Sequence, residues 1–204
     1  IIVVLAENIN EGASCMIRKL TREEIIDTYN QHLVTDFPED EVKPLAIILD
    51  FYDHHRYECY GLFQEDKMLA YAYFADFKTE NIDAYLLDYY AVVKTARNQG
   101  IGSRLLNELL PTLEKHRCIL IEIESLNTAR NQEEATLRKR RRDFYLRNQV
   151  QLSQVVAQAF DVEYQIMYYA KEVLEDAFIH QQVQLVYQEL FASFTPRPFE
   201  VYPL

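Results

Sequence analysis

The sequence KTARNQGIGSRLLNELL, residues 94–110, contains the strongest local pattern in the chain. The whole chain contains only four glycines, and two of them, Gly100 and Gly102, stand here one residue apart. An apolar run precedes them and a leucine-rich run follows, so they mark the junction of a predicted strand and a predicted helix. Helix N-termini present unpaired N–H groups, and glycine lets a ligand approach the backbone closely. The junction therefore predicts a seat for a pyrophosphate.

The form of this junction is R-x-x-G-x-G, from Arg97 to Gly102. It is not a P-loop, because G-K-[ST] is absent, and it is not a dinucleotide-binding fingerprint, because GxGxxG and its downstream acid are absent. A tight turn that binds no ligand stays open as the structural alternative.

Composition indicates one folded domain. A chain of 204 residues can bury one core of ordinary size, and it contains no internal repeat and no Gly/Ser linker. An apolar fraction of 49% argues against disorder. The net charge of −11 disfavours general nucleic-acid binding and suits a cationic substrate.

The cysteines and histidines indicate the redox compartment of the protein and whether it holds a metal. Cys15, Cys59 and Cys118 are odd in number and lack CxxC spacing, which fits a reducing compartment, expected to be the cytoplasm. The five histidines have no ligand spacing with carboxylates or cysteines, so we expect no metal. No apolar run approaches the roughly 20 residues that span a bilayer, so we expect no membrane association.

The N-terminal segment stands apart from the rest of the chain. Residues 1–15 precede Met16, where MIRKLTREE has the form of a natural start. The apolar residues 1–6 are too few for a secretory signal and lack its basic flank. We interpret residues 1–15 as an upstream extension or a remnant of an expression vector. The alternative is an added edge strand.

Apolar periodicity predicts the element order β-α-α-β-β-β-α-β-α-β-β-α, an α/β fold with a mixed sheet and helices on both faces. A capping box of Thr21 and Glu24 starts the first helix, and Pro111 should kink the third helix or end it near Leu110. The expected strands are 16–20, 84–93, 118–125, 150–160 and 162–170, with a further hairpin over 57–77 that has a polar turn at Gln64–Lys67. The expected helices are 21–34, 45–55, 101–110, 133–148 and 178–194, before an irregular tail with Pro196, Pro198 and Pro203.

Two motifs together resemble a known family. Residues 86–110 resemble the acetyl-CoA-binding motif of the GCN5-related N-acetyltransferases (GNAT), [RQ]-x-x-G-x-[GA] between the fourth strand and third helix. RRDFYLRNQV, residues 141–150, resembles the F-Y-x-x-x-G-F segment that ends the family's fourth helix, but Gln149 and Val150 replace its glycine and phenylalanine. If position 149 needs a positive φ, Gln149 is strained, unless Asn148 takes over that geometry.

The resemblance covers about residues 16–170 and implies one acetyltransferase-like domain, on which residues 171–204 pack as a C-terminal helix and tail. It implies acetyl-CoA as cosubstrate and direct acetyl transfer to an amine, with no acyl-enzyme. The acceptor would be a small-molecule or peptide amine. Whether the chain forms a homodimer stays open. The alternative function is a catalytically inactive CoA-binding sensor or interaction module.

The resemblance also assigns a cofactor site. Backbone groups of the fourth strand would pair with the pantetheine arm, and backbone N–H groups of residues 99–103 would hold the pyrophosphate. The expected cofactor-binding residues are Ala91, Val92, Val93, Arg97, Asn98, Gln99, Gly100, Ile101, Gly102 and Ser103.

The catalytic candidates each have a structural alternative. Tyr145 matches the family's general acid, but it could be a core aromatic. Glu122 and Glu124 lie two apart on one strand face and could deprotonate an ammonium directly or through water, or pair with basic residues such as those of the following helix. Asp88 is a third candidate, or a buried partner for a tyrosine or arginine. The basic run 138–142 is expected to be a solvated helix face, since Glu134 lies four residues before Arg138.

Overall fold

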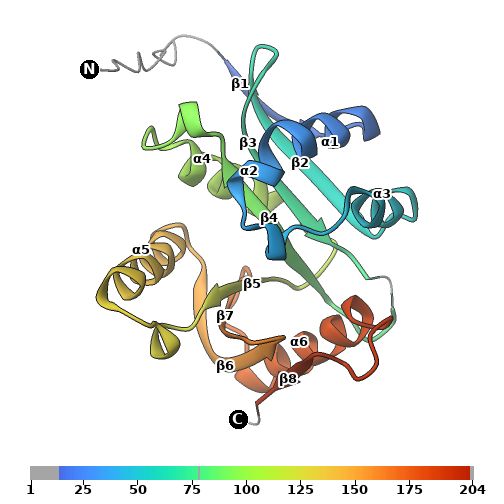
Figure 1. Cartoon of the computed structure of the whole chain (residues 1–204), viewed down its shortest axis with the longest axis vertical. Coiled ribbons are helices and arrows are strands. Elements are labelled where there is room, and N and C mark those ends of the chain that lie inside the picture. The colour runs from blue at the N-terminus through green and yellow to red at the C-terminus, as the bar shows by residue number, and fades with distance from the viewer. Residues whose placement is uncertain (1–13, 78, 203–204) are drawn as a thin grey trace. The chain divides into compact units, whose positions relative to one another are not determined.

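The structure, a computed structural model, describes residues 14–77 and 79–202, so residues 1–13 of the expected N-terminal extension lie outside it. The chain forms two compact units (Figure 1). The first unit comprises Ile1–Ala75 and Asp88–Leu109, and the second comprises Asp76–Leu87 and Leu110–Leu204. The expected division at residue 170 stays a prediction.

The first unit contains the predicted elements from the first strand to the glycine junction. The capping box of Thr21 and Glu24 is confirmed at the start of its first helix. The predicted helix 21–34 continues through a π-helical turn. The elements are β1 (Cys15–Lys19), α1 (Arg22–Thr28), the π-helix Tyr29–Leu33, α2 (Val34–Asp36), a 3-10 turn Glu39–Glu41, α3 (Leu45–Asp53), β2 (Tyr57–Gln64), β3 (Lys67–Ala75), the second half of β4 (Ala84–Val92), a 3-10 turn Lys94–Ala96 and α4 (Ile101–Leu109).

The strands of the first unit follow one another in sheet order, and β1–β2 and β2–β3 are antiparallel. Every residue of β3 from Leu69 to Ala75 is buried, so both faces of this strand are covered. Helix α3 packs against β2, and α4 packs against β1 and β3. The glycine junction thus lies between a buried sheet and a helix anchored on that sheet.

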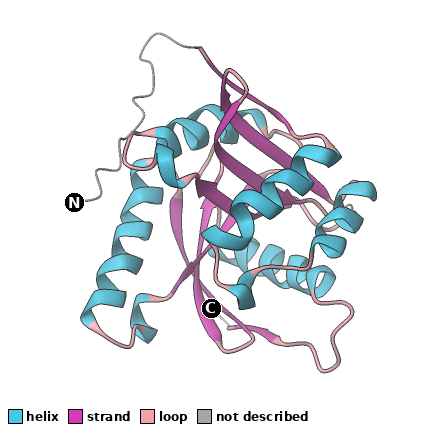
Figure 2. Ribbon diagram, turned by 45° about the horizontal axis from the view of Figure 1, so that its top comes forward, coloured by secondary structure: helices cyan, strands magenta, loops and turns pink. Residues whose placement is uncertain are grey.

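The second unit contains the predicted elements that follow the junction. Its elements are the first half of β4, a 3-10 turn Leu110–Thr112, β5 (Cys118–Glu124), a 3-10 turn Leu126–Thr128, α5 (Gln132–Arg147), β6 (Gln151–Ala159), β7 (Val162–Tyr169), α6 (Asp176–Leu190) and β8 (Phe199–Val201). They can be followed in Figure 2, where helices are cyan and strands magenta. The end of α4 at Leu109 confirms the stop predicted before Pro111.

In the second unit β4 and β5 are parallel, with Ala84–Leu87 opposite Cys118–Ile121 in register. Strand β5 then pairs antiparallel with β7, and β7 with β6. The strand order is β1-β2-β3-β4-β5-β7-β6-β8, which confirms a mixed α/β fold. No helix of the described residues is long and apolar enough to cross a membrane.

The expectation that the proline-containing C-terminal tail is irregular is wrong in one respect. Residues Phe199–Val201 form β8, which pairs antiparallel with β6. Pro196 and Pro198 precede this strand, and its Phe199 ring contacts the rings of Tyr187 and Phe191, with centroids 5.4 and 5.8 Å away. Helix α6 packs on β6 and β8 and buries one apolar face. The helix therefore covers apolar surface of its own unit.

Candidate functional site

The glycine junction has the backbone conformation that an anion seat requires. Asn98 and Gly100 adopt positive φ values of 62° and 76°. A Cβ added to Gly100 would meet no heavy atom within 4 Å, so the space above this backbone is open. Glycine thus avoids the strain of a positive φ and leaves the backbone accessible to a ligand. Such alternation of conformations creates concavities lined with N–H groups.

The start of α4 supplies the donors of this seat. The first helical bond runs from the Arg104 N–H to the Gly100 carbonyl, at 3.0 Å. The N–H groups of Ile101, Gly102 and Ser103 therefore precede the helical hydrogen bonds. A helix N-terminus of this kind favours an anion through its N–H groups and its dipole. We call the backbone N–H groups of residues 99–103 the anion seat.

Side chains within the loop hold its shape. The Arg97 guanidinium donates through Nε to the Val92 carbonyl at 3.0 Å and through Nη2 to Asp36 Oδ1 at 2.7 Å. The Gln99 amide donates to the Thr95 carbonyl at 3.1 Å. Both side chains thus have partners within their own unit, and the roles of Arg97 and Gln99 in cofactor binding stay predictions.

The end of β4 is also engaged internally. The Val93 N–H donates to the Leu69 carbonyl at 3.0 Å, and the Val92 carbonyl accepts from Arg97. Ala91 and Val92 are half-buried, and Val93 is buried. Pairing of this strand with a pantetheine arm stays a prediction.

The second unit carries Tyr145, on the last turn of α5. Its side chain is 7% exposed, and its ring meets the Phe144 ring edge-on at 5.4 Å. Burial disfavours the phenolate and raises the Tyr145 pKa to about 12, although Arg141 opposes that shift. The phenol is therefore protonated at neutral pH, as a general acid must be.

The turn after α5 shows which residue, Asn148 or Gln149, adopts the positive φ. The N–H groups of Asn148 and Val150 both donate to the Tyr145 carbonyl, at 2.9 and 3.2 Å. This helix-ending turn places Gln149 at φ 66°. The alternative in which Asn148 takes over the positive φ is wrong: it has φ −104°, and its side chain donates to the Phe144 carbonyl at 2.7 Å.

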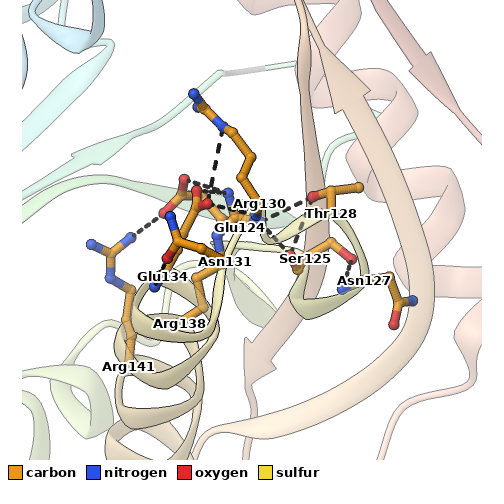
Figure 3. A network of polar contacts seen from close by, with 9 residues as sticks. All are labelled: Glu124, Ser125, Asn127, Thr128, Arg130, Asn131, Glu134, Arg138 and Arg141. Carbon is orange, nitrogen blue, oxygen red and sulfur yellow. Dashed lines mark hydrogen bonds and ion pairs between the residues drawn. The ribbon is translucent and has the colours of Figure 1, made fainter.

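Glu124, at the end of β5, is paired with the following helix. Arg138 Nη2 and Arg141 Nη1 each lie 3.2 Å from one of its oxygens (Figure 3). This is the structural alternative expected from the sequence. Glu122 instead accepts a hydrogen bond from the buried Tyr187 hydroxyl of α6. Both candidate bases are thus held by neighbours within the second unit.

The expected solvated face is wrong for Arg138, whose side chain is only 7% exposed. Its Nη1 donates to the Ser125 carbonyl at 2.5 Å and to the Thr128 hydroxyl at 3.0 Å, and its Nη2 pairs with Glu134 at 2.6 Å (Figure 3). The 3-10 turn before α5 presents these acceptors to one face of the helix, and they compensate the buried charge. Lys139, Arg140 and Arg141 are exposed as expected.

In the first unit Asp88 is a buried structural partner. Its carboxylate pairs with Lys43 Nζ at 2.8 and 2.9 Å and accepts a hydrogen bond from the Tyr57 hydroxyl. The alternative of a buried tyrosine partner is confirmed, with a lysine in place of the arginine. Sequence reasoning missed Lys43 and Asp36, because nothing local marks their long-range contacts. Among the described residues no cluster of three or more His, Cys, Asp or Glu side chains could hold a metal ion.

Comparison with protein families decides the assignment. The model described as the acetyltransferase (GNAT) family matches residues 22–135, which is more than half of the chain. The chain is a member of the GNAT family. This family consists of N-acetyltransferases, so the resemblance drawn from the glycine junction is confirmed. Comparison with curated protein sequences found no match.

Solved GNAT structures share the fold. A protein from Bacteroides thetaiotaomicron assigned to the GNAT family aligns with a TM-score of 0.63 at 21% identity, over 83% of this chain and 95% of its own. The ribosomal-protein-S18-alanine N-acetyltransferase of Escherichia coli gives 0.55 at 18%, over 80% and 97%. The spermidine N-acetyltransferase of Vibrio cholerae, in complex with CoA and spermine, gives 0.57 at 10%, over 77% and 95%.

Proposed function

We propose that this GNAT protein is an acetyl-CoA-dependent N-acetyltransferase that transfers the acetyl group directly to an amine. The observation that carries the proposal is the anion seat: positive φ at Asn98 and Gly100, and open space above Gly100 at the start of α4. The CoA bound to the structurally similar spermidine N-acetyltransferase supports CoA as the ligand.

The chemistry needs one base and one acid. The amine loses a proton, and its nitrogen attacks the thioester carbonyl to form a C–N bond. The C–S bond then breaks, and the departing thiolate takes a proton. We assign that proton to the Tyr145 phenol, which burial keeps protonated. The products are the acetylated amine and CoA.

The base is proposed among the carboxylates of β5. Two arginines contact Glu124, so direct protonation would compete with these ion pairs. We therefore propose that Glu124 orders a water that accepts the ammonium proton and passes it on to bulk solvent, so that Glu124 keeps both ion pairs. Glu122, which accepts a hydrogen bond from the Tyr187 hydroxyl, is the second candidate.

The acceptor is proposed to be a cationic amine. The chain's net charge of −11 attracts cations. Two GNAT proteins of similar structure are named for amine acceptors, spermidine and the alanine of a ribosomal protein. The three cysteines are free thiols, which supports action in a reducing compartment such as the cytoplasm. A homodimer, like the absence of nucleic-acid and membrane partners, stays a prediction.

A second candidate is a catalytically inactive CoA-binding module. It is favoured by the internal partners of Glu122 and Glu124, which occupy both proposed bases. The two functions agree on CoA binding and differ on turnover.

Thiol release from acetyl-CoA, corrected for hydrolysis without amine, tests the proposal. The panel should contain a polyamine, a peptide with a free N-terminal alanine and a simple primary amine. Amine-dependent release with at least one acceptor, and an acetylated product of matching mass, supports the enzyme. CoA binding by calorimetry without such release would support the inactive module, and no CoA binding would contradict both.

A further inference from the structure

A carboxylate distant in sequence holds the loop that carries the anion seat. Asp36 is the last residue of α2, and its side chain is only 2% exposed although it lies 61 residues before Arg97. Arg97 Nη2 donates to Asp36 Oδ1 at 2.7 Å, and the Tyr71 hydroxyl donates to Asp36 Oδ2 at 3.2 Å. Burial and the Asp36 charge raise the Tyr71 pKa, so its hydroxyl stays a donor. Both oxygens of Asp36 are thus occupied from separate elements.

The Arg97 guanidinium closes the turn that leads into the seat. Its Nε donates to the Val92 carbonyl at 3.0 Å, while Nη2 is fixed by Asp36. Val92 ends β4, and Arg97 directly precedes Asn98, the first residue with positive φ. One side chain therefore ties together the two ends of the turn 92–97. Asp36 itself is held by the hydroxyl of Tyr71, which lies in the buried part of β3. The contact between Asp36 and Arg97 therefore has a fixed position relative to the sheet.

We propose that Asp36 is a positioning residue for CoA binding, which acts by clamping Arg97 against the Val92 carbonyl so that the N–H groups of residues 99–103 stay aimed at the pyrophosphate. Asp36 touches neither cofactor nor substrate in this role. The inference rests on the proposed function, because it assigns the seat to CoA. It also predicts that Arg97 serves the cofactor through loop geometry, since Asp36 already neutralises its charge.

The clamp and a direct phosphate contact by Arg97 predict opposite effects of Asp36→Asn. If Arg97 clamps the loop, loss of the Asp36 charge loosens the turn and weakens CoA binding about three- to tenfold. If Arg97 binds phosphate directly, the same change frees its charge and tightens binding. The clamp should raise KM for acetyl-CoA and leave kcat at saturation within about twofold, because the chemistry is untouched.

Glu24→Gln is the matched control. The Arg18–Glu24 pair belongs to the same unit and has a similar distance of 2.6 Å, but it stabilises the start of α1. The variant Glu24→Gln should therefore lower the melting temperature without changing the affinity for CoA.

Two measurements on wild type, Asp36→Asn and Glu24→Gln test the clamp. The first is amide hydrogen exchange of residues 98–103 without ligand, and the second is the CoA dissociation constant by calorimetry. Faster exchange of these amides and weaker binding in Asp36→Asn alone support the proposal. Unchanged exchange, or tighter binding, overturns it. If the wild type binds no CoA, the proposed function fails, and exchange alone still decides whether Asp36 clamps the loop.

Discussion

Substitutions at two glycines of the first unit can distinguish an effect on CoA binding at the anion seat from an effect on the stability of the fold. Gly100→Ala introduces a Cβ at φ 76°, where no heavy atom lies within 4 Å. An L-residue in this conformation costs about 1–2 kcal/mol of folding free energy, and the stiffer unfolded chain returns about 0.5–1 kcal/mol. The net loss of about 1 kcal/mol should lower the melting temperature by about 2–4 °C. The new methyl group would project into the space above the seat.

CoA affinity should fall more than stability does. We expect Gly100→Ala to weaken CoA binding at least about tenfold, equivalent to about 1.4 kcal/mol, because the methyl group meets the pyrophosphate. Gly61→Ala is the control: its Cβ would lie 2.5 Å from Phe63 Cε2 and 2.9 Å from Leu20 Cδ2. Overpacking there should cost about 1–3 kcal/mol of stability with no change in affinity.

Calorimetry of CoA binding and thermal unfolding of both variants provide the comparison. Unchanged affinity in Gly100→Ala, with a lowered melting temperature, would refute the placement of the pyrophosphate. Equal affinity losses in both variants would also refute it, because the effect would then follow stability alone.

Three further predictions concern the second unit. Tyr145→Phe should lower kcat by about 10²–10⁴-fold with little change in acetyl-CoA affinity, and near-full turnover would make Tyr145 a core aromatic. Because the Tyr145 pKa is raised to about 12, kcat should show no loss from this group between pH 8 and 10; a fall there that Tyr145→Phe abolishes would contradict the raised pKa of Tyr145. Gln149→Gly should raise the melting temperature by about 1–3 °C, because glycine adopts φ 66° without strain, whereas Gln149→Ala should not; equal effects of the two would contradict this account.

The sequence predicted the elements because they depend on local patterns. Apolar periodicity located the strands and helices, and the paired glycines located the strand-to-helix junction. The capping box of Thr21 and Glu24 was readable from four residues. The sequence left open whether residue 149 or Asn148 adopts the positive φ, and the structure places it at Gln149, where the helix-ending turn requires it.

The remaining features depend on contacts between distant segments. Strand β8 forms because Phe199–Val201 pair with the edge of β6, and no local sequence pattern predicts that pairing. Arg138 is buried because a 3-10 turn before its helix presents acceptors. Asp36 and Arg97 meet across 61 residues, and a single sequence gives no sign of that pair.

Labelling of glycine backbone nitrogens tests the central claim most directly. The chain contains four glycines, so a protein labelled with ¹⁵N-glycine gives only four amide signals. The variants Gly61→Ala, Gly100→Ala and Gly102→Ala assign three of them. Upon titration with CoA, we predict saturable shifts of the Gly100 and Gly102 signals and an unmoved Gly61 signal. CoA binding that leaves Gly100 and Gly102 unmoved would contradict an anion seat at the start of α4.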